Sequence, residues 1–181
     1  MDWNAHLRDQ LDWHWTNQLR PRFDGLSDEE YLWEPVPGSW NVRRREAADP
    51  VLAVGSGAYV IDYAPEADPP PVTTIAWRLA HLVVGVFGLR VAAHFGGPPV
   101  SYDTFDYTGS AEQALAQLDA AYAAWNAGVA ALGEDGLLRP CGEAEGMYAE
   151  RPLADLVLHI NREAIHHGAE VSLLRDLYLR R

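Results

Sequence analysis

Hydrophobic residues recur at steps of three and four along four long stretches of the chain. This spacing predicts amphipathic helices over residues 4–20, 74–95, 111–132 and 153–178. No stretch shows a sustained alternation of period two, and the sequence contains no internal repeat. The pattern therefore favours an all-α protein, most simply a four-helix bundle within a single domain that spans residues 1–181.

Capping residues support these helices and predict a shorter one. Thr73 or Thr74 can cap the second long helix, and Ser110 the third, which Gly133 is expected to end. Ser27 and Glu30 have the spacing of a capping box, which predicts a short helical piece before the Pro-rich segment that follows.

Residues 39–73 have a different character from the helical stretches. They are rich in Gly, Pro and Asp, and two short segments at 40–43 and 58–63 carry β-branched and aromatic residues. We expect a long irregular excursion here, with a small hairpin inside it. The excursion separates the first two long helices, so these helices need not be antiparallel neighbours joined by a tight turn.

Composition and charge narrow the range of partners. The chain is 48% hydrophobic and 22% charged, and 14 basic against 26 acidic residues give a formal net charge of −12. This charge disfavours binding to nucleic acid or to an anionic membrane, so we expect small-molecule partners, with a homodimer left open. The single cysteine, Cys141, fits a reducing cytosol. The apolar runs look too interrupted to span a bilayer, and we expect a cytoplasmic protein.

Two polar residues interrupt the apolar stripe of the last helix. Glu163 and His167 are four residues apart, so they project side by side from one helix face. A buried carboxylate is costly unless it is paired, hydrogen-bonded or bound to a metal. Two interpretations stay open: a Glu163–His167 ion pair, or a metal site completed by a histidine from a facing helix.

Two motifs resemble the DinB superfamily of metal-binding four-helix proteins, which includes thiol-dependent transferases and maleylpyruvate isomerase. The motifs are TTIAWRLAHL at 73–82 and HINREAIHHGAEVSLLRDLY at 159–178. The resemblance implies that His81 and His167 are the first and last metal ligands. Glu163 stands where many members have a histidine. This departure resembles the mycothiol-dependent isomerase branch, whose site has two histidines and a glutamate.

The resemblance also implies a chemistry. A site made of His81, Glu163 and His167 suits zinc, with nickel and iron as alternatives, and leaves room for mycothiol or a similar thiol. His159 and His166 are then candidate catalytic residues beside the ligands. Arg43 and Trp77 are candidates for holding the thiol cofactor, and Cys141 is expected to be a spectator.

Two functions of different classes follow. The first is a metal-dependent enzyme that activates a thiol for transfer to, or isomerisation of, a small electrophile. The second is a stress-associated metal- or ligand-binding helical bundle without turnover. The sequence favours the first only slightly, because an open metal site permits catalysis without requiring it.

Overall fold

The computed structural model describes residues 1–64 and 67–181, and it is mainly helical, as expected. The first long helical segment is α1, which continues through a π turn, η1, and a 3-10 turn, η2. The second begins as α3, passes through a π segment, η4, and ends as α4. The bounds of the helices are α1 Trp3–His14, η1 Trp15–Leu19, η2 Arg20–Phe23, α2 Asp28–Tyr31, η3 Arg45–Ala47, α3 Ile75–His81, η4 Leu82–Gly88, α4 Leu89–Phe95, α5 Ala111–Leu137, η5 Glu143–Tyr148 and α6 Leu153–Tyr178.

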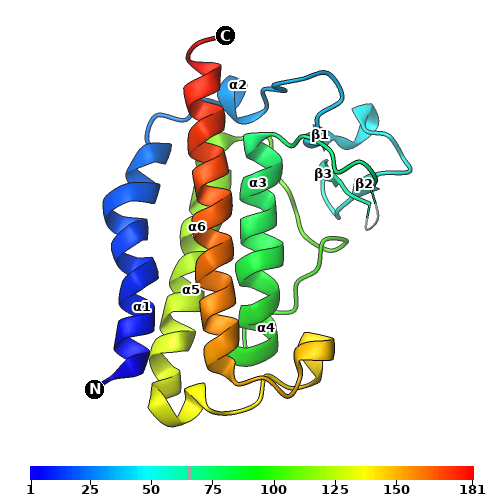
Figure 1. Ribbon diagram of the computed structural model, residues 1–181. Coiled ribbons are helices and arrows are strands. Elements are labelled where there is room, and N and C mark those ends of the chain that lie inside the picture. The colour runs from blue at the N-terminus through cyan, green and yellow to red at the C-terminus, as the bar shows by residue number, and fades with distance from the viewer. Residues whose placement is uncertain (65–66) are drawn as a thin grey trace.

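The long helical segments lie side by side with their axes roughly aligned (Figure 1). The α1 helix packs against α5 and α6, and α3 packs against the same two helices. Their shared core is aromatic as well as aliphatic: Trp15 stacks on Tyr122 with 3.9 Å between ring centroids, and Phe87 meets both rings edge-on. The segment α3–η4–α4 runs in the opposite direction to α6 (Figure 1).

The excursion holds a sheet that is larger than the small hairpin expected there. Three short antiparallel strands form it in the order β1-β3-β2, with Val42 paired to Ile61. The strands are β1 Val42–Arg44, β2 Ala53–Val54 and β3 Tyr59–Asp62. The expected small hairpin is thus a three-stranded sheet, which lies beside the start of α3 (Figure 1). The middle strand, β3, buries Val60, Ile61 and Asp62, so the sheet is anchored by its middle strand.

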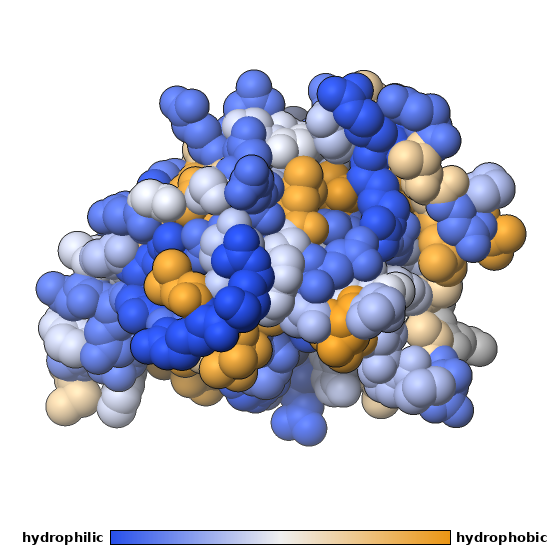
Figure 2. Space-filling model, turned by 90° about the horizontal axis from the view of Figure 1, so that it is seen from above, coloured by the Kyte–Doolittle hydropathy of each residue, from blue (hydrophilic) through white to orange (hydrophobic). Residues whose placement is uncertain are grey.

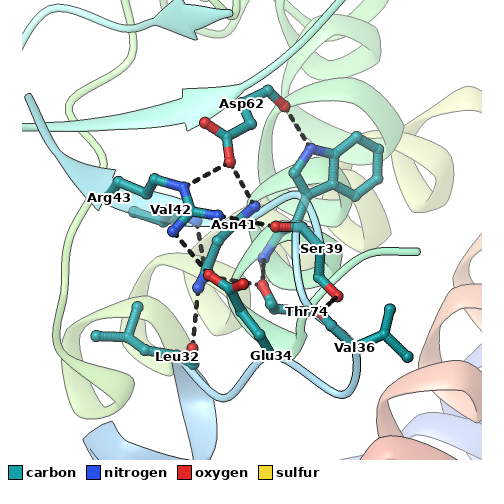
Figure 3. A network of polar contacts seen from close by, with 10 residues as sticks. Leu32, Glu34, Val36, Ser39, Asn41, Val42, Arg43, Asp62 and Thr74 are labelled. Atoms are coloured by element: carbon teal, nitrogen blue, oxygen red, sulfur yellow. Dashed lines mark hydrogen bonds and ion pairs between the residues drawn. The ribbon is translucent and has the colours of Figure 1, made fainter. Parts of the chain in front are cut away.

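A network of polar side chains fastens this sheet to the helices (Figure 3). The Arg43 guanidinium donates to the Asp62 carboxylate at 2.8 Å, to the Glu34 carboxylate at 2.7 Å and to the Ser39 carbonyl at 2.9 Å. The Asp62 carbonyl accepts from the indole nitrogen of Trp77, on α3, at 2.7 Å. Because Asp62 and Trp77 are both buried, these bonds satisfy groups that water cannot reach.

The expected helix caps are largely present. The Thr74 hydroxyl accepts from the Trp77 backbone at 3.2 Å and donates to Asn41 at 2.8 Å, so the cap of α3 is itself part of the network. Ser27 caps α2, but the Glu30 side chain does not reach back to it. It pairs instead with Arg175 on α6, with 2.7 Å between the Glu30 carboxylate and Arg175 Nε.

The third helix was expected to end at Gly133. That glycine has a positive φ of 62° and kinks the chain, after which α5 continues to Leu137. The sequence therefore predicts the sharp turn at Gly133 but not the continuation of the helix beyond it. Glycine with a positive φ usually ends a helix.

The segment Ile75–Phe95 corrects the expectation that no apolar run could span a bilayer. It is 21 residues long and contains an 18-residue window with a mean hydropathy of 1.5, of which 61% is buried inside the protein. Burial of this kind is typical of a core helix. Viewed from above, the surface is mostly hydrophilic with separate hydrophobic patches (Figure 2).

Close packing between α4 and α5 depends on Gly128. A Cβ added there would overlap the ring of Phe95. We expect Gly128→Ala to lower the free energy of unfolding by about 1–2 kcal/mol, because overpacking outweighs the usual helical preference for alanine. Denaturant titration measures this change. In a Phe95→Ala background the same substitution should stabilise the protein, and additive effects would contradict the predicted overlap.

Candidate metal centre

Two histidines from antiparallel helices meet in the interior of the protein. His81 ends α3, and His167 lies near the middle of α6. Their ring centroids are 4.8 Å apart and the rings are perpendicular. His167 is 8% exposed, so this pair is largely shielded from water. The structure thus brings together two of the three residues that the sequence indicated as ligands.

Both histidines are held by their Nδ1 atoms. Nδ1 of His81 lies 2.6 Å from the hydroxyl of Tyr102, and Nδ1 of His167 lies 2.7 Å from a carboxylate oxygen of Glu170. Histidines that bind metals are usually oriented in this way, with one ring nitrogen bonded to an oxygen and the other turned to the ion. Here the Nε2 atoms are the ones left for an ion.

The third predicted ligand faces His167 from the same helix. Glu163 Oε2 lies 3.6 Å from His167 Nε2. When Nδ1 of His167 donates its proton to Glu170, the neutral ring has a bare lone pair at Nε2. A lone pair that faces a carboxylate oxygen is stabilised by a cation between them. The pKa of His167 is lowered, mainly because the ring is buried, and this disfavours a second proton on the ring at Nε2. The donor set therefore fits a metal ion.

Tyr102 reaches His81 only because residue 85 is a glycine. A Cβ on Gly85 would overlap the Tyr102 hydroxyl and lie 3.0 Å from His81 Nδ1. Tyr102 is also held from other sides: its ring stacks on Tyr63 with 4.7 Å between centroids, and its carbonyl accepts from Tyr107. The tyrosine is thus fixed in place independently of its bond to His81.

A second group of ligand atoms shares His167. Those of His166, His167 and Glu170 lie within 4.8 Å of one another, whereas the predicted triad does not form so tight a group among the described residues. However, Arg78 Nε lies 3.2 Å from Glu170 Oε2. Its positive charge would repel a divalent ion at this group. Glu170 therefore suits the task of orienting His167 better than that of binding an ion.

Of the two candidate catalytic histidines on α6, His159 lies one turn before Glu163, and His166 lies between Glu163 and His167 in the sequence. His159 Nδ1 is 3.4 Å from Glu163 Oε1 and 2.6 Å from the Arg162 guanidinium. The side chain of His166 is 63% exposed, and its Nε2 lies 3.5 Å from Glu170. His159 thus contacts the predicted ligand set through Glu163, whereas His166 contacts the opposite side of the site.

The two candidate cofactor residues have different surroundings. Trp77 stacks on His81, with 5.2 Å between centroids and 17° between ring planes, so it forms a wall of the site. Arg43 lies in the network beside the sheet, where its guanidinium is bonded to Glu34, Asp62 and Ser39. Those contacts serve to fasten the sheet.

A cavity of about 490 Å³ lies next to His159, between α4, α6 and η5. His159 and Arg162 contribute to its wall and also contact Glu163, so the cavity adjoins the predicted ligand set. Cys141 lines the cavity as well. Burial raises the pKa of its thiol, which fits the expected spectator role better than that of a nucleophile.

Sequence reasoning missed Tyr102, Glu170 and Arg78. Glu170 follows His167 by three residues, a spacing that places it on the same helix face and could have indicated it. Arg78 precedes His81 by three residues in the same way. Tyr102 lies in the loop after α4, and no local spacing connects it with His81.

Comparison with known proteins agrees with the pattern of this site. The family model of the DinB superfamily matches residues 50–171. The chain belongs to the DinB superfamily. The matched span includes His81, Glu163 and His167. Among curated proteins and among solved structures, no match is found.

The buried histidines give the protein a pH-dependent stability. Burial, followed by the charges of His167, Arg78 and Arg90, lowers the pKa of His81 from 6.5 to about 3. Between these values the unfolded chain binds a proton that the folded chain does not. The free energy of unfolding therefore falls as pH drops from about 6.5, by up to about 1.4 kcal/mol per pH unit.

Denaturant titration of chelator-treated protein at pH 6.5 and pH 5 tests this effect. His81→Gln should reduce the pH dependence, and part should remain because the pKa of His167 is lowered as well. An unchanged pH dependence in the variant would show that His81 does not titrate differently in the folded and unfolded chain.

Proposed function

We propose that this DinB protein binds one divalent metal ion through His81, Glu163 and His167 and uses it to activate a low-molecular-weight thiol, such as mycothiol. The reaction would be transfer of the thiol to a small electrophile, or a thiol-dependent isomerisation. The observation that carries this proposal is the geometry of His167, whose Nδ1 is bonded to Glu170 while its Nε2 faces Glu163.

The donor set indicates which ions suit the site. Two imidazoles and one carboxylate are borderline ligands, which favours zinc and is compatible with nickel or iron. Three protein ligands leave a coordination position open. A divalent ion in such a site, when bound, lowers the pKa of a thiol enough to hold it as a thiolate at neutral pH.

His159 is placed to act on the electrophile. Its Nδ1 accepts a hydrogen bond from the Arg162 guanidinium at 2.6 Å, so the neutral ring carries its proton at Nε2. His159 also lines the cavity next to Glu163. We infer that the Nε2–H group donates to an oxygen of the electrophile as negative charge develops there. Trp77, stacked on His81, keeps the ligand ring in place and excludes water from one side.

Metal analysis of the purified protein tests the ligands. Wild-type protein should hold about one divalent ion per chain, as expected for a three-ligand site. His81→Ala, Glu163→Gln and His167→Ala should each lose this ion. Tyr102→Phe keeps the ring and removes only the hydroxyl that orients His81, so the affinity for Zn²⁺ should fall by about 10–100-fold.

His166→Ala is the matched control for these variants. It removes a ligand of the alternative group around Glu170 and leaves the proposed triad intact. Retention of the ion in His81→Ala together with its loss in His166→Ala would place the ion in that alternative group and refute the assignment.

Thiol chemistry is tested with the zinc-loaded protein and monochlorobimane, whose conjugates are fluorescent. Mycothiol, or another bacterial thiol, should be conjugated at a rate that depends on the metal. His159→Gln should slow the reaction about 100-fold while the metal content stays unchanged, because a positioned proton donor contributes about this factor. Metal binding without conjugation of any thiol would favour the second function, a stress-associated binding protein without turnover.

A further inference from the structure

We propose that the cavity beside His159 binds a small organic acid, with its carboxylate held by Arg90. The acid would be part of the thiol or electrophile used at the metal centre. This link between the cavity and the metal centre rests on the proposed function. The carboxylate site itself stands on separate observations, which concern the surroundings of Arg90.

The cavity has the size and the mixed lining of a small-molecule site. Its volume of about 490 Å³ lies within the usual range for such sites. Leu156, Leu158 and Tyr148 supply apolar surface, and Arg90 and Glu145 supply charge. The short η5 segment, which carries Glu145 and Tyr148 of this lining, lies near the end where α4 stops and α6 begins (Figure 1).

Arg90 lacks a well-aligned partner for a largely buried cation. Its side chain is 24% exposed, and Nε lies 3.3 Å from Glu145 Oε1. That contact does not meet hydrogen-bond geometry, and Nε is buried without a hydrogen bond. Among the described residues, no acceptor is within hydrogen-bonding geometry of either terminal nitrogen. Of the three guanidinium nitrogens only Nε is buried, so the terminal nitrogens are open to a ligand in the cavity, and a bound carboxylate would accept two parallel hydrogen bonds from the guanidinium.

Glu145 pairs with Arg90 through charge, but the oxygen that faces Arg90 is also bonded to His94 and leaves the terminal guanidinium donors unsatisfied. His94 Nε2 lies 2.9 Å from the same Oε1 atom, and both side chains are almost fully buried. The nearby Glu145 also limits the charge of a ligand. A singly charged carboxylate can be bound by Arg90 beside a glutamate, whereas a doubly charged phosphate would meet stronger repulsion. The chemistry therefore favours a carboxylate.

The cavity lies at a distance from the proposed metal ligands, along the axes of the two antiparallel helices that carry them. Arg90 follows His81 by nine residues on one helix, and His159 precedes His167 by eight on its antiparallel neighbour. At about 1.5 Å per residue, both lie roughly 12–14 Å along the helix axes from the ring pair. A ligand that reaches from the metal centre to Arg90 is therefore elongated, with its acid group remote from its reacting group.

Binding of hexanoate, measured by calorimetry, tests the carboxylate site, and hexanamide is the neutral probe of the same size. Hexanoate should bind wild-type protein at least about tenfold more tightly than hexanamide, since a charge-assisted bidentate pair is lost with the amide. Arg90→Gln should remove this preference. Arg90→Lys, which keeps the charge beside Glu145, should retain only part of it because lysine lacks the planar fork.

Two controls separate this proposal from the metal site. Arg151→Gln removes a 68%-exposed arginine that also lines the cavity, and it should bind hexanoate like the wild type. His167→Ala, which should lack the metal, should still bind hexanoate.

Hexanoate binding that survives in Arg90→Gln but disappears with the metal would mean that the acid binds the metal, and would overturn the proposal. Equal binding of hexanoate and hexanamide would overturn it too. If the wild-type protein binds no metal, the proposed metal site fails, while the hexanoate result still decides the carboxylate site. The two proposals can therefore fail separately.

Discussion

The packing of α3 against α6 depends on one constraint: a buried imidazole, that of His167, lies beside the half-buried carboxylate of Glu163 where the two helices meet. Both groups interrupt an otherwise apolar stripe, and polar groups that lose water are costly unless their donors and acceptors are satisfied. Tyr102 bonds Nδ1 of His81, and Glu170 bonds Nδ1 of His167, so one nitrogen of each ring is satisfied. The proposed metal ion would meet the remaining requirement, at the Nε2 atoms and Glu163.

The small sheet contributes to the same site from a distance. Asp62, at the end of β3, binds Arg43 through its carboxylate and Trp77 through its carbonyl. Trp77 in turn stacks on His81. The excursion therefore fixes the first turn of α3, and with it the direction of the His81 ring. A segment that contains no predicted metal ligand thus determines how precisely one ligand is held, which is the usual role of residues that support a metal site.

The predictable part of this structure is local, and the unpredicted part depends on contacts between distant residues. Helical periodicity located the long helices, and the i, i+4 spacing of Glu163 and His167 indicated their contact, because both are properties of neighbouring turns. The sequence predicts only a hairpin where the structure has a three-stranded sheet, because β2 is two residues long and too short to show a pattern. The π segment Leu82–Gly88 carries no sequence signal, and Tyr102 reaches His81 from a loop. Arg43 looked available for a ligand because its partners, Glu34 and Asp62, come from other segments.

Two carboxylates flank His167, and Arg78 gives them different roles. Glu163 and Glu170 lie four residues before and three residues after it, so helix geometry alone would make either one a ligand. Arg78 lies against Glu170 and neutralises it, which leaves that carboxylate as a hydrogen-bond acceptor for the ring. Glu163 faces His159 and the Arg162 guanidinium at 3.6 Å, and its surroundings are more open. Under the proposed assignment, the positive charge of Arg78 disfavours a metal ion at Glu170, whereas the Arg162 side chain near Glu163 is 69% exposed and its charge is screened by water. Glu163 is therefore the better carboxylate ligand of the two.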